Sequence, residues 1–139
     1  MEITANAPQT VPENQNVQFT DTLTCGSCSI THRAGSGLIT LKGVTNQCRA
    51  RFKISFGGNI AIPTGGTVAP ISVGIAIDGE PIASTTMIST PAAVEEYNNI
   101  FGAIFIDIPR GCCSTVSVRN LSNQEIEIQN ANLIIERVA

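Results

Sequence analysis

Five cysteines and one histidine are the residues whose types and spacing could do chemistry in this chain. Cys25 and Cys28 have the Cys-x-x-Cys spacing of half a zinc site, because a tight turn can aim two thiolates at one tetrahedral ion. His32 or Cys48 could complete such a site. The other two cysteines are adjacent in the sequence and cannot easily bind one ion together. We therefore expect no bound metal and no cofactor, and keep these four residues as the candidates should a metal bind.

Other chemistry of the cysteines leaves two alternatives open. A redox role for Cys-x-x-Cys needs a following helix to lower the thiol pKa, and no helical pattern follows Cys28. The thiols could stay reduced in the core, because free cysteine is among the most often buried residue types. They could instead form disulfides after release into an oxidising medium, within or between protomers, and the odd number leaves one thiol over in each chain. The disulfide candidates are Cys25, Cys28, Cys48, Cys112 and Cys113.

The remaining polar residues form no catalytic pattern. His32 stands beside Arg33, as expected of a surface or turn residue, and a Gly-x-Ser-x-Gly nucleophile elbow is absent. The chain has no Trp and one Tyr, so it lacks the aromatic platforms that sugar chemistry commonly uses. The acidic pairs Glu95–Glu96 and Glu125 with Glu127 are expected to be solvated. We expect no enzyme and no catalytic residues.

The composition predicts an all-β fold to position these residues. The chain contains 19 Ile, 9 Val and 14 Thr but only 5 Leu. β-Branched side chains have restricted χ1 angles and suit strands better than helices. Short apolar segments alternate with Gly, Pro, Asn and Asp at intervals of about ten residues, which is typical of a β-sandwich, barrel or jelly roll.

Length and charge limit the domain organisation and the partners. The chain has 139 residues, enough for one domain, and a net charge of −3, which does not suggest a nucleic-acid partner. No segment approaches the roughly 18 apolar residues of a membrane helix, and the N-terminus lacks the pattern of a secretory signal. We expect synthesis in a cytoplasm and no membrane insertion. Residues 1–20 are polar and predict an extended N-terminal arm, followed by one domain over residues 21–139.

Individual strands can be placed from the pattern of side chains. Residues 47–56 alternate between an apolar face and a basic face that carries Arg49, Arg51 and Lys53. The basic row is expected to face water, or else an acidic surface, either of another protein or formed by the Glu125 and Glu127 of a neighbouring protomer. Residues 71–77 form a strand, and Asp78 and Gly79 predict a type I′ turn into a second strand over 80–87. Residues 91–96 predict a turn.

Residues 100–108 are apolar on both faces until Asp107. A strand of this kind is usually covered by protein on both sides. We therefore expect this strand to lie inside the sandwich, near the centre of the domain.

The order of these segments resembles a known family. The segments that carry the resemblance are Gly37–Leu41, Ile75–Pro81, Ile104–Pro109, Val118–Asn120 and Ile128–Ile134. Over roughly residues 20–139 they are similar to small TNF/C1q-like jelly-roll proteins, and most to the short cysteine-containing versions in phages and prophages of Gram-positive gut bacteria. The chain lacks the core aromatics and the collagen stalk of the animal proteins, which argues against receptor signalling.

The resemblance implies a single jelly-roll β-sandwich that forms a homotrimer. It also implies display on a virion, as a capsid decoration or head-fibre protein whose partners are a capsid or other virion protein and a cell-surface glycan or protein. One alternative is a bacterial C1q-like surface or spore-coat adhesion module. Another is a carbohydrate-binding jelly roll, against which the missing Trp counts.

Overall fold

The predicted alternation of residues 47–56 is confirmed in the longest strand, β6 (Arg49–Ala61). The side chains of Ala50, Phe52, Ile54 and Phe56 are fully buried, whereas the basic residues between them are exposed or half-buried. A strand with one buried and one solvated face is expected in an antiparallel sheet. β6 lies between β10 (Asn98–Pro109) and β12 (Ile126–Arg137), antiparallel to both.

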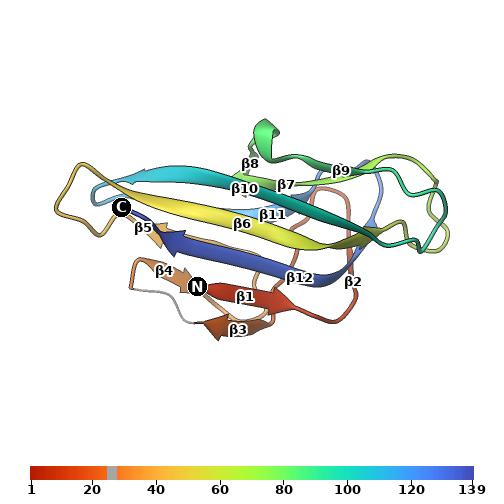
Figure 1. Cartoon of the computed structure of the whole chain (residues 1–139), viewed down its shortest axis with the longest axis horizontal. Helices are drawn as coiled ribbons and strands as arrows, with labels where there is room; N and C mark the ends of the chain where they lie inside the picture. Colours follow the sequence, from red (N-terminus) through yellow and green to blue (C-terminus); the bar gives the residue numbers. More distant parts are fainter. Residues whose placement is uncertain (25–27) are drawn as a thin grey trace.

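The structure, a computed structural model, describes residues 1–24 and 28–139 and contains two antiparallel sheets. The first sheet has the strand order β10-β6-β12-β1-β3, with β2 paired to β12, and the second has the order β4-β5-β11-β7-β8, with β9 paired to β7 (Figure 1). The strands not yet given bounds are β1 (Glu2–Ala5), β2 (Gln9–Val11), β3 (Asp21–Thr24), β4 (Ile30–His32), β5 (Ile39–Lys42), β7 (Ile71–Ile77), β8 (Glu80–Pro81), β9 (Met87–Ser89) and β11 (Cys113–Asn120).

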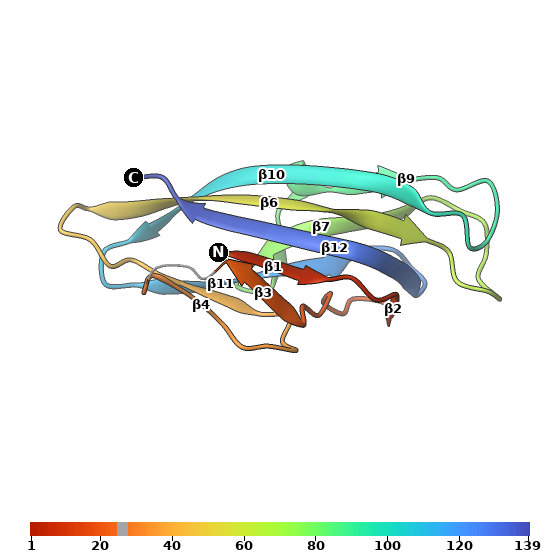
Figure 2. The ribbon, with the colours of Figure 1, turned by 60° about the horizontal axis from the view of Figure 1, so that its bottom comes forward.

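The core lies between the two sheets, which stack face to face (Figure 2). Its largest fully buried side chains come from strands of both sheets and include Phe52 and Phe56 of β6, Ile39 of β5 and Ile75 of β7. Inward-facing residues of two sheets that interdigitate in this way make a β-sandwich. Within the described part of the chain, no helix is long and apolar enough to cross a membrane.

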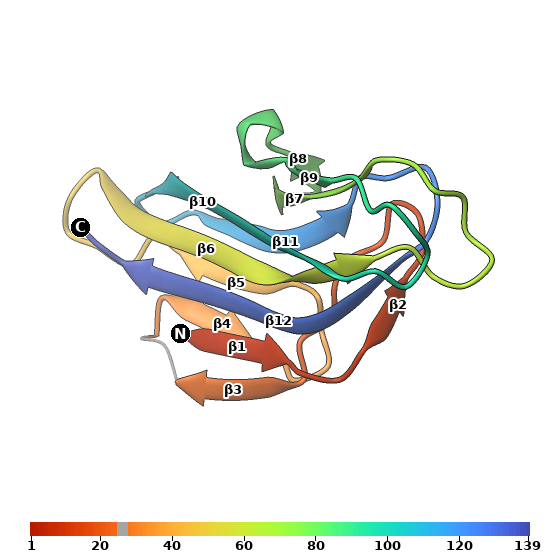
Figure 3. The ribbon, with the colours of Figure 1, turned by 45° about the vertical axis from the view of Figure 1, so that its right-hand side comes forward.

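The expectation of an extended N-terminal arm over residues 1–20 is wrong. β1 lies within the first sheet, hydrogen-bonded to β12 on one side and to β3 on the other. Ile3, Val11, Val17 and Phe19 are almost fully buried (Figure 3 shows β1 between its two neighbours). These few apolar residues suffice because strands need only every second residue to face the core. The polar residues between them give the segment its arm-like composition.

The prediction that residues 100–108 lie inside the sandwich is also wrong. They belong to β10, which is the edge strand of the first sheet. Phe101 and Phe105 point outward with 67% and 60% of their surface exposed, while Ile100 and Ile108 point into the core. The strand is apolar on both faces, but only one face is covered within this chain.

The hairpin predicted after residue 77 is confirmed at its turn and only partly beyond it. Asp78 and Gly79 have φ angles of 54° and 84°, the positive values that a type I′ turn requires. The strand expected over 80–87 is interrupted: β8 has two residues, a 3-10 turn follows at Ala83–Thr85, and β9 then pairs with β7 again. The Thr85 hydroxyl accepts a hydrogen bond from the Ile75 amide at 2.9 Å and donates to the Ile82 carbonyl at 2.7 Å, which holds the interruption in place. Residues 91–96 form turns, as predicted.

Candidate functional site

The outward face of the first sheet near its β10 edge carries a group of exposed apolar side chains. Residues paired across neighbouring strands point to the same side of a sheet. The register places Phe101 beside Gly57, and Ala103 beside Ser55 and then Ile134. We call this group the apolar face, defined by Phe101, Ala103 and Phe105 of β10, Ser55 and Gly57 of β6, and Ile134 of β12.

The apolar face combines two protruding rings: Phe101 lies beside the small Gly57, and Phe105 lies beside the half-buried Lys53. Phe101 and Phe105 are 67% and 60% exposed, and Ile134 is 41% exposed. A Cβ atom added at Gly57 would lie 3.7 Å from the Phe101 ring, so the ring lies close over the glycine. Exposed phenylalanines grouped on one surface commonly mark a protein contact site, whereas scattered single apolar residues do not.

The edge beside the apolar face is apolar as well. Ile104 and Ile106 of β10 point toward the core but remain half-buried, since no strand follows β10 in its sheet. β9 of the second sheet packs against this edge, with the Met87 sulfur 3.0 Å from where a Cβ of Gly102 would lie. Ile88, the next residue, is 67% exposed. A second apolar surface therefore meets the apolar face along β10.

A charged cluster borders the apolar face at one end of β10. Arg51 donates two hydrogen bonds to the Asp107 carboxylate, at 2.8 and 3.1 Å, and Arg49 Nε lies 3.2 Å from the same carboxylate. The hydrogen bonds from Arg51 hold the pKa of Asp107 below its usual range, and they raise the pKa of Arg51. The basic row predicted on β6 therefore has an acidic partner within its own chain. The suggested contacts with an acidic capsid, or with Glu125 and Glu127 of a neighbour, remain predictions.

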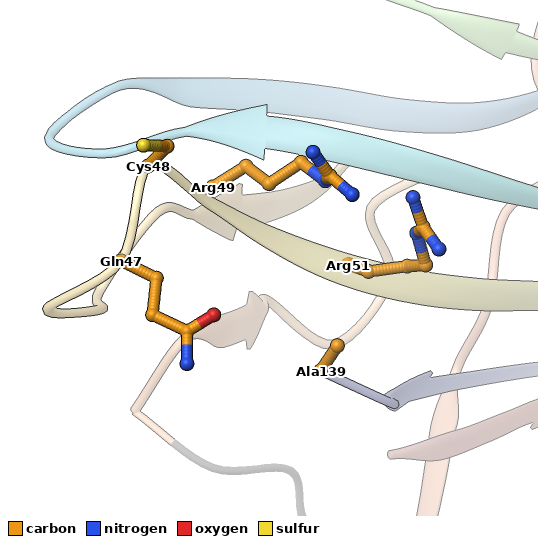
Figure 4. A pocket seen from close by; sticks show the side chains of 5 residues that line it. All are labelled: Gln47, Cys48, Arg49, Arg51 and Ala139. Carbon is orange, nitrogen blue, oxygen red and sulfur yellow. The ribbon is translucent and has the colours of Figure 1, made fainter.

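A hollow next to this cluster is lined by Gln47, Cys48, Arg49, Arg51 and Ala139 (Figure 4). The two arginine side chains extend from β6 toward β10, and Ala139 lies on the other side of β6 (Figure 4). Polar and apolar atoms both line it, and the two arginine side chains are exposed to solvent. An open hollow of this kind differs from the enclosed, mostly apolar pockets that usually hold small ligands.

The cysteines do not lie in the core. Cys28, Cys48, Cys112 and Cys113 are exposed and unbonded to one another, so the alternative in which the thiols are buried in the core does not hold for these four, and the disulfide alternative stays a prediction. Cys25 lies outside the described residues. The core is filled mainly by Ile, Val, Leu, Phe and Ala, whereas Cys113 begins β11 and the other three described cysteines lie in loops.

The candidate metal ligands are not assembled within the described chain. Among residues 1–24 and 28–139, no group of three or more His, Cys, Asp or Glu side chains could hold a metal ion. Cys28, His32 and Cys48 therefore form no such group, and a role for Cys25 stays untested.

His32 is half-buried at the end of β4, where its ring contacts other parts of the fold. Its Nε2 atom lies 2.9 Å from the Ser36 carbonyl oxygen, which can only accept, so Nε2 carries a proton. The ring packs edge-on against Phe19, with 6.5 Å between ring centroids. Nδ1 is buried without a hydrogen-bond partner. The histidine therefore orders the 32–36 turn against the N-terminal segment.

Polar contacts also join loops at the other end of the sandwich. The Tyr97 hydroxyl donates to Glu127 at 2.9 Å, and the Thr64 hydroxyl donates to Glu95 at 2.6 Å. Burial raises the pKa of Tyr97 to about 12, and the hydrogen bond and charge of Glu127 act in the same direction. No sequence pattern indicates this pairing, because the two residues are 30 positions apart.

Comparison with solved structures establishes the fold. The globular domain of zebrafish complement 1qA matches with a TM-score of 0.63 and 12% identity, over 96% of this chain and 93% of that one. Murine APRIL matches with a TM-score of 0.60 and 9% identity, over 95% of this chain and 96% of that one. Neither is named as an enzyme. No protein-family model and no curated protein sequence matches the chain. The predicted TNF/C1q-like jelly roll is thus confirmed as a fold.

Proposed function

We propose that this chain assembles into a homotrimer through the apolar face and acts as a structural display component of a phage particle, as a capsid decoration or head-fibre protein. The observation that carries the self-association is the exposure of Phe101 and Phe105 on an edge strand. The trimer and the particle are further supported by the TNF/C1q-like resemblance of the sequence.

The edge position of the apolar face favours a head-to-tail contact. Along β10, one apolar surface faces outward through Phe101 and Phe105, and another faces the open edge through Ile104 and Ile106. If the edge of one copy packs on the outward face of the next, two different surfaces meet. Such heterologous contacts form closed rings when the rotation between copies closes, and a threefold ring covers both surfaces on every copy.

Burial of the exposed phenylalanines would contribute favourably to association. Full burial of one Phe side chain contributes about 1.5–3 kcal/mol. Phe101 and Phe105 are each at least 60% exposed in the single chain, so most of their apolar area is available to a partner. Part of the gain offsets the loss of rotational and translational freedom on association.

The test of self-association is a pair of charge substitutions on the apolar face. Phe101→Lys and Phe105→Lys should convert a trimer into folded monomers, because a lysine desolvated against apolar side chains is unfavourable. Sedimentation velocity measures the change, and circular dichroism confirms that the variants remain folded.

Val68→Lys is the matched control, since Val68 is 51% exposed in a loop away from the face. This variant should stay trimeric. A wild-type protein that sediments as a monomer across the micromolar range would refute the trimer.

The proposed role on a phage particle is tested by finding where the protein is located. Antibodies against the protein, applied as gold conjugates to density-purified particles from a lysate, should label heads or head fibres in electron micrographs. Labelling of intact uninfected cells, with none on particles, would contradict this role and favour the adhesion module.

A further inference from the structure

Four exposed cysteines lie at one end of the sandwich, although they come from three separate segments of the chain. The Cys112 carbonyl accepts a hydrogen bond from the Gly43 amide at 2.8 Å, and the Cys48 carbonyl accepts from the Arg110 amide at 3.0 Å. Cys113 is paired with Lys42 in the β11–β5 ladder, and the Lys42 amide donates to the Ser29 carbonyl, one residue after Cys28. Figure 1 shows these segments at the same end as residue 139. We call this end the thiol end.

The thiols at this end are placed for reactions between chains. Each is exposed, and none of the four described cysteines is bonded to another within the chain. A disulfide requires Cα atoms within about 7 Å and converging Cβ atoms, so exposed thiols that find no partner in one chain can find one in an adjoining copy.

Two of the four cysteines border the proposed contact. Pro109 and Arg49 form the last pair of the β10–β6 ladder, so Cys48 immediately precedes this pair on β6 and Cys112 follows it closely after β10. Cys112 follows the edge strand β10, and Cys48 precedes β6, the neighbouring strand that carries part of the apolar face. We therefore call Cys112 the edge-side cysteine and Cys48 the face-side cysteine. Cys28 precedes β4, which lies at the opposite edge of the second sheet from β7 and β8.

Ring symmetry restricts which cysteines can pair. In a ring of three identical copies, a bond that repeats at every contact must join two different residues, because contacts between copies are heterologous. A Cys48–Cys48 bond would link only two copies and leave the third unpaired. The repeating bond therefore joins an edge-side cysteine to a face-side cysteine.

We propose that Cys112 of one copy and Cys48 of the next form an interchain disulfide, which closes the trimer covalently at the thiol end. The inference rests on the proposed self-association. The oxidant is a small disulfide such as oxidised glutathione. The thiolate of one cysteine attacks it and displaces one glutathione thiolate, and the thiolate of the second copy then attacks the protein sulfur and displaces the other. Two protein thiols are oxidised, one glutathione disulfide is reduced to two thiols, and the thiol protons pass to the glutathione thiolates.

The experiment treats reduced, purified protein with oxidised glutathione, blocks the remaining thiols and separates the chains on a non-reducing denaturing gel. The wild type should give a three-chain band that disappears with reductant. Cys48→Ser and Cys112→Ser should each lose this band. Cys28→Ser and Cys113→Ser are matched controls at the same end and should keep it.

A tryptic digest of the three-chain band should contain residues 43–49 disulfide-linked to residues 111–119. Phe105→Lys keeps every thiol but should lose the band, because the copies no longer meet. Chains that remain single, with disulfides inside them, would overturn the proposal, as would covalent species larger than three chains or loss of the band in Cys113→Ser in place of Cys112→Ser.

Sedimentation of the reduced wild type separates the two proposals. A reduced trimer that gives no covalent band refutes the disulfide alone. A reduced monomer refutes the proposed self-association.

Discussion

At the scale of single residues, the ionisation of Tyr97 reports on the packing of the segment before β10 against Glu127 of β12. Tyr97 is the only tyrosine in a chain without tryptophan, so ultraviolet absorbance follows its ionisation without interference. Burial disfavours the tyrosinate, and the Glu127 carboxylate accepts the phenol proton in a hydrogen bond while repelling the negative charge of the ionised form. Both effects favour the neutral phenol in the folded protein.

We predict that Tyr97 titrates with a pKa of about 12 in the folded protein. Glu127→Gln should lower this pKa only in part, because burial is the larger cause. Glu125→Gln, two residues away on the exposed side, should leave it unchanged. Spectrophotometric titration measures all three, and a wild-type midpoint near the ordinary tyrosine value of about 10 would contradict the described packing.

The difference between the pKa of Tyr97 in the folded protein and in the unfolded chain makes the stability depend on pH. The folded pKa lies above the unfolded one, so the contribution of Tyr97 is fully present below about pH 10 and is lost as the pH rises toward about 12. Denaturation midpoints of Tyr97→Phe, which cannot ionise, should therefore fall less than those of the wild type across this window.

At the scale of elements, the N-terminal segment is a structural part of the sandwich. The Val17 amide donates to the Val118 carbonyl at 2.8 Å, and the Gly35 amide donates to the Phe19 carbonyl at 2.8 Å. The Phe19 ring meets the Phe56 ring edge-on at a centroid distance of 6.3 Å. The segment therefore joins β1, β11 and the core.

Phe19→Ala should destabilise the protein by about 3–5 kcal/mol, the usual cost of removing a fully buried phenylalanine. Urea denaturation measures the free energy of unfolding. Leu23→Ala, at a position 64% exposed on β3, serves as the control and should change it by less than about 0.5 kcal/mol. A Phe19→Ala variant as stable as this control would show that the segment behaves as an arm after all.

Some features of these elements could be predicted from sequence patterns, and others could not. The alternation of residues 49–56 and the Asp78–Gly79 turn were predictable, because strand period and positive φ angles are local properties. The burial of Phe19 and the edge position of Phe105 were not, because both depend on which strands become neighbours in the sheet. The pattern of residues 100–108 indicated two covered faces. The single chain covers one, and the proposed trimer covers the other.

The residue types of the candidate cysteine and basic sites could be predicted from the sequence, but the positions of these residues in the fold could not. Cysteine spacing alone could not distinguish buried from exposed thiols, since Cys48 and Cys112 are 64 positions apart and come to the same end of the sandwich only through the pairing of β6 with β10. The charged pair of Arg51 and Asp107 likewise follows from the β10–β6 register, which only the three-dimensional structure fixes.

At the scale of the whole molecule, the two ends of the sandwich differ in charge. Lys42 ends β5, Arg49 begins β6, Arg110 follows β10 and Arg137 ends β12, all at the thiol end, whereas Glu95 and Glu96 precede β10 and Glu125 precedes β12 at the other end. The proposed contact runs along the side of the sandwich between these ends. Assembly therefore orients all copies in the same direction and presents a basic end and an acidic end to the surroundings.

If folding is coupled to this assembly, thermal stability should depend on protein concentration. Binding of folded copies to one another stabilises the folded state by mass action. The reduced wild type should therefore show a higher Tm at higher protein concentration in scanning calorimetry. The Tm of Phe105→Lys should not move over the same range, and a concentration-independent wild-type Tm would contradict a trimer that dissociates before it unfolds.

The open edge of β10 carries a risk before assembly is complete. This strand has 12 residues with one side of its backbone unpaired by any described strand, and two exposed phenylalanines stand on it. Such an edge can template the addition of further strands and lead to fibrillar aggregates. Asp107 and Pro109 protect only its last residues. In the proposed assembly, newly made chains either close into a ring, which buries the edge, or add to one another without limit. The supply of chains must therefore match the rate of ring closure.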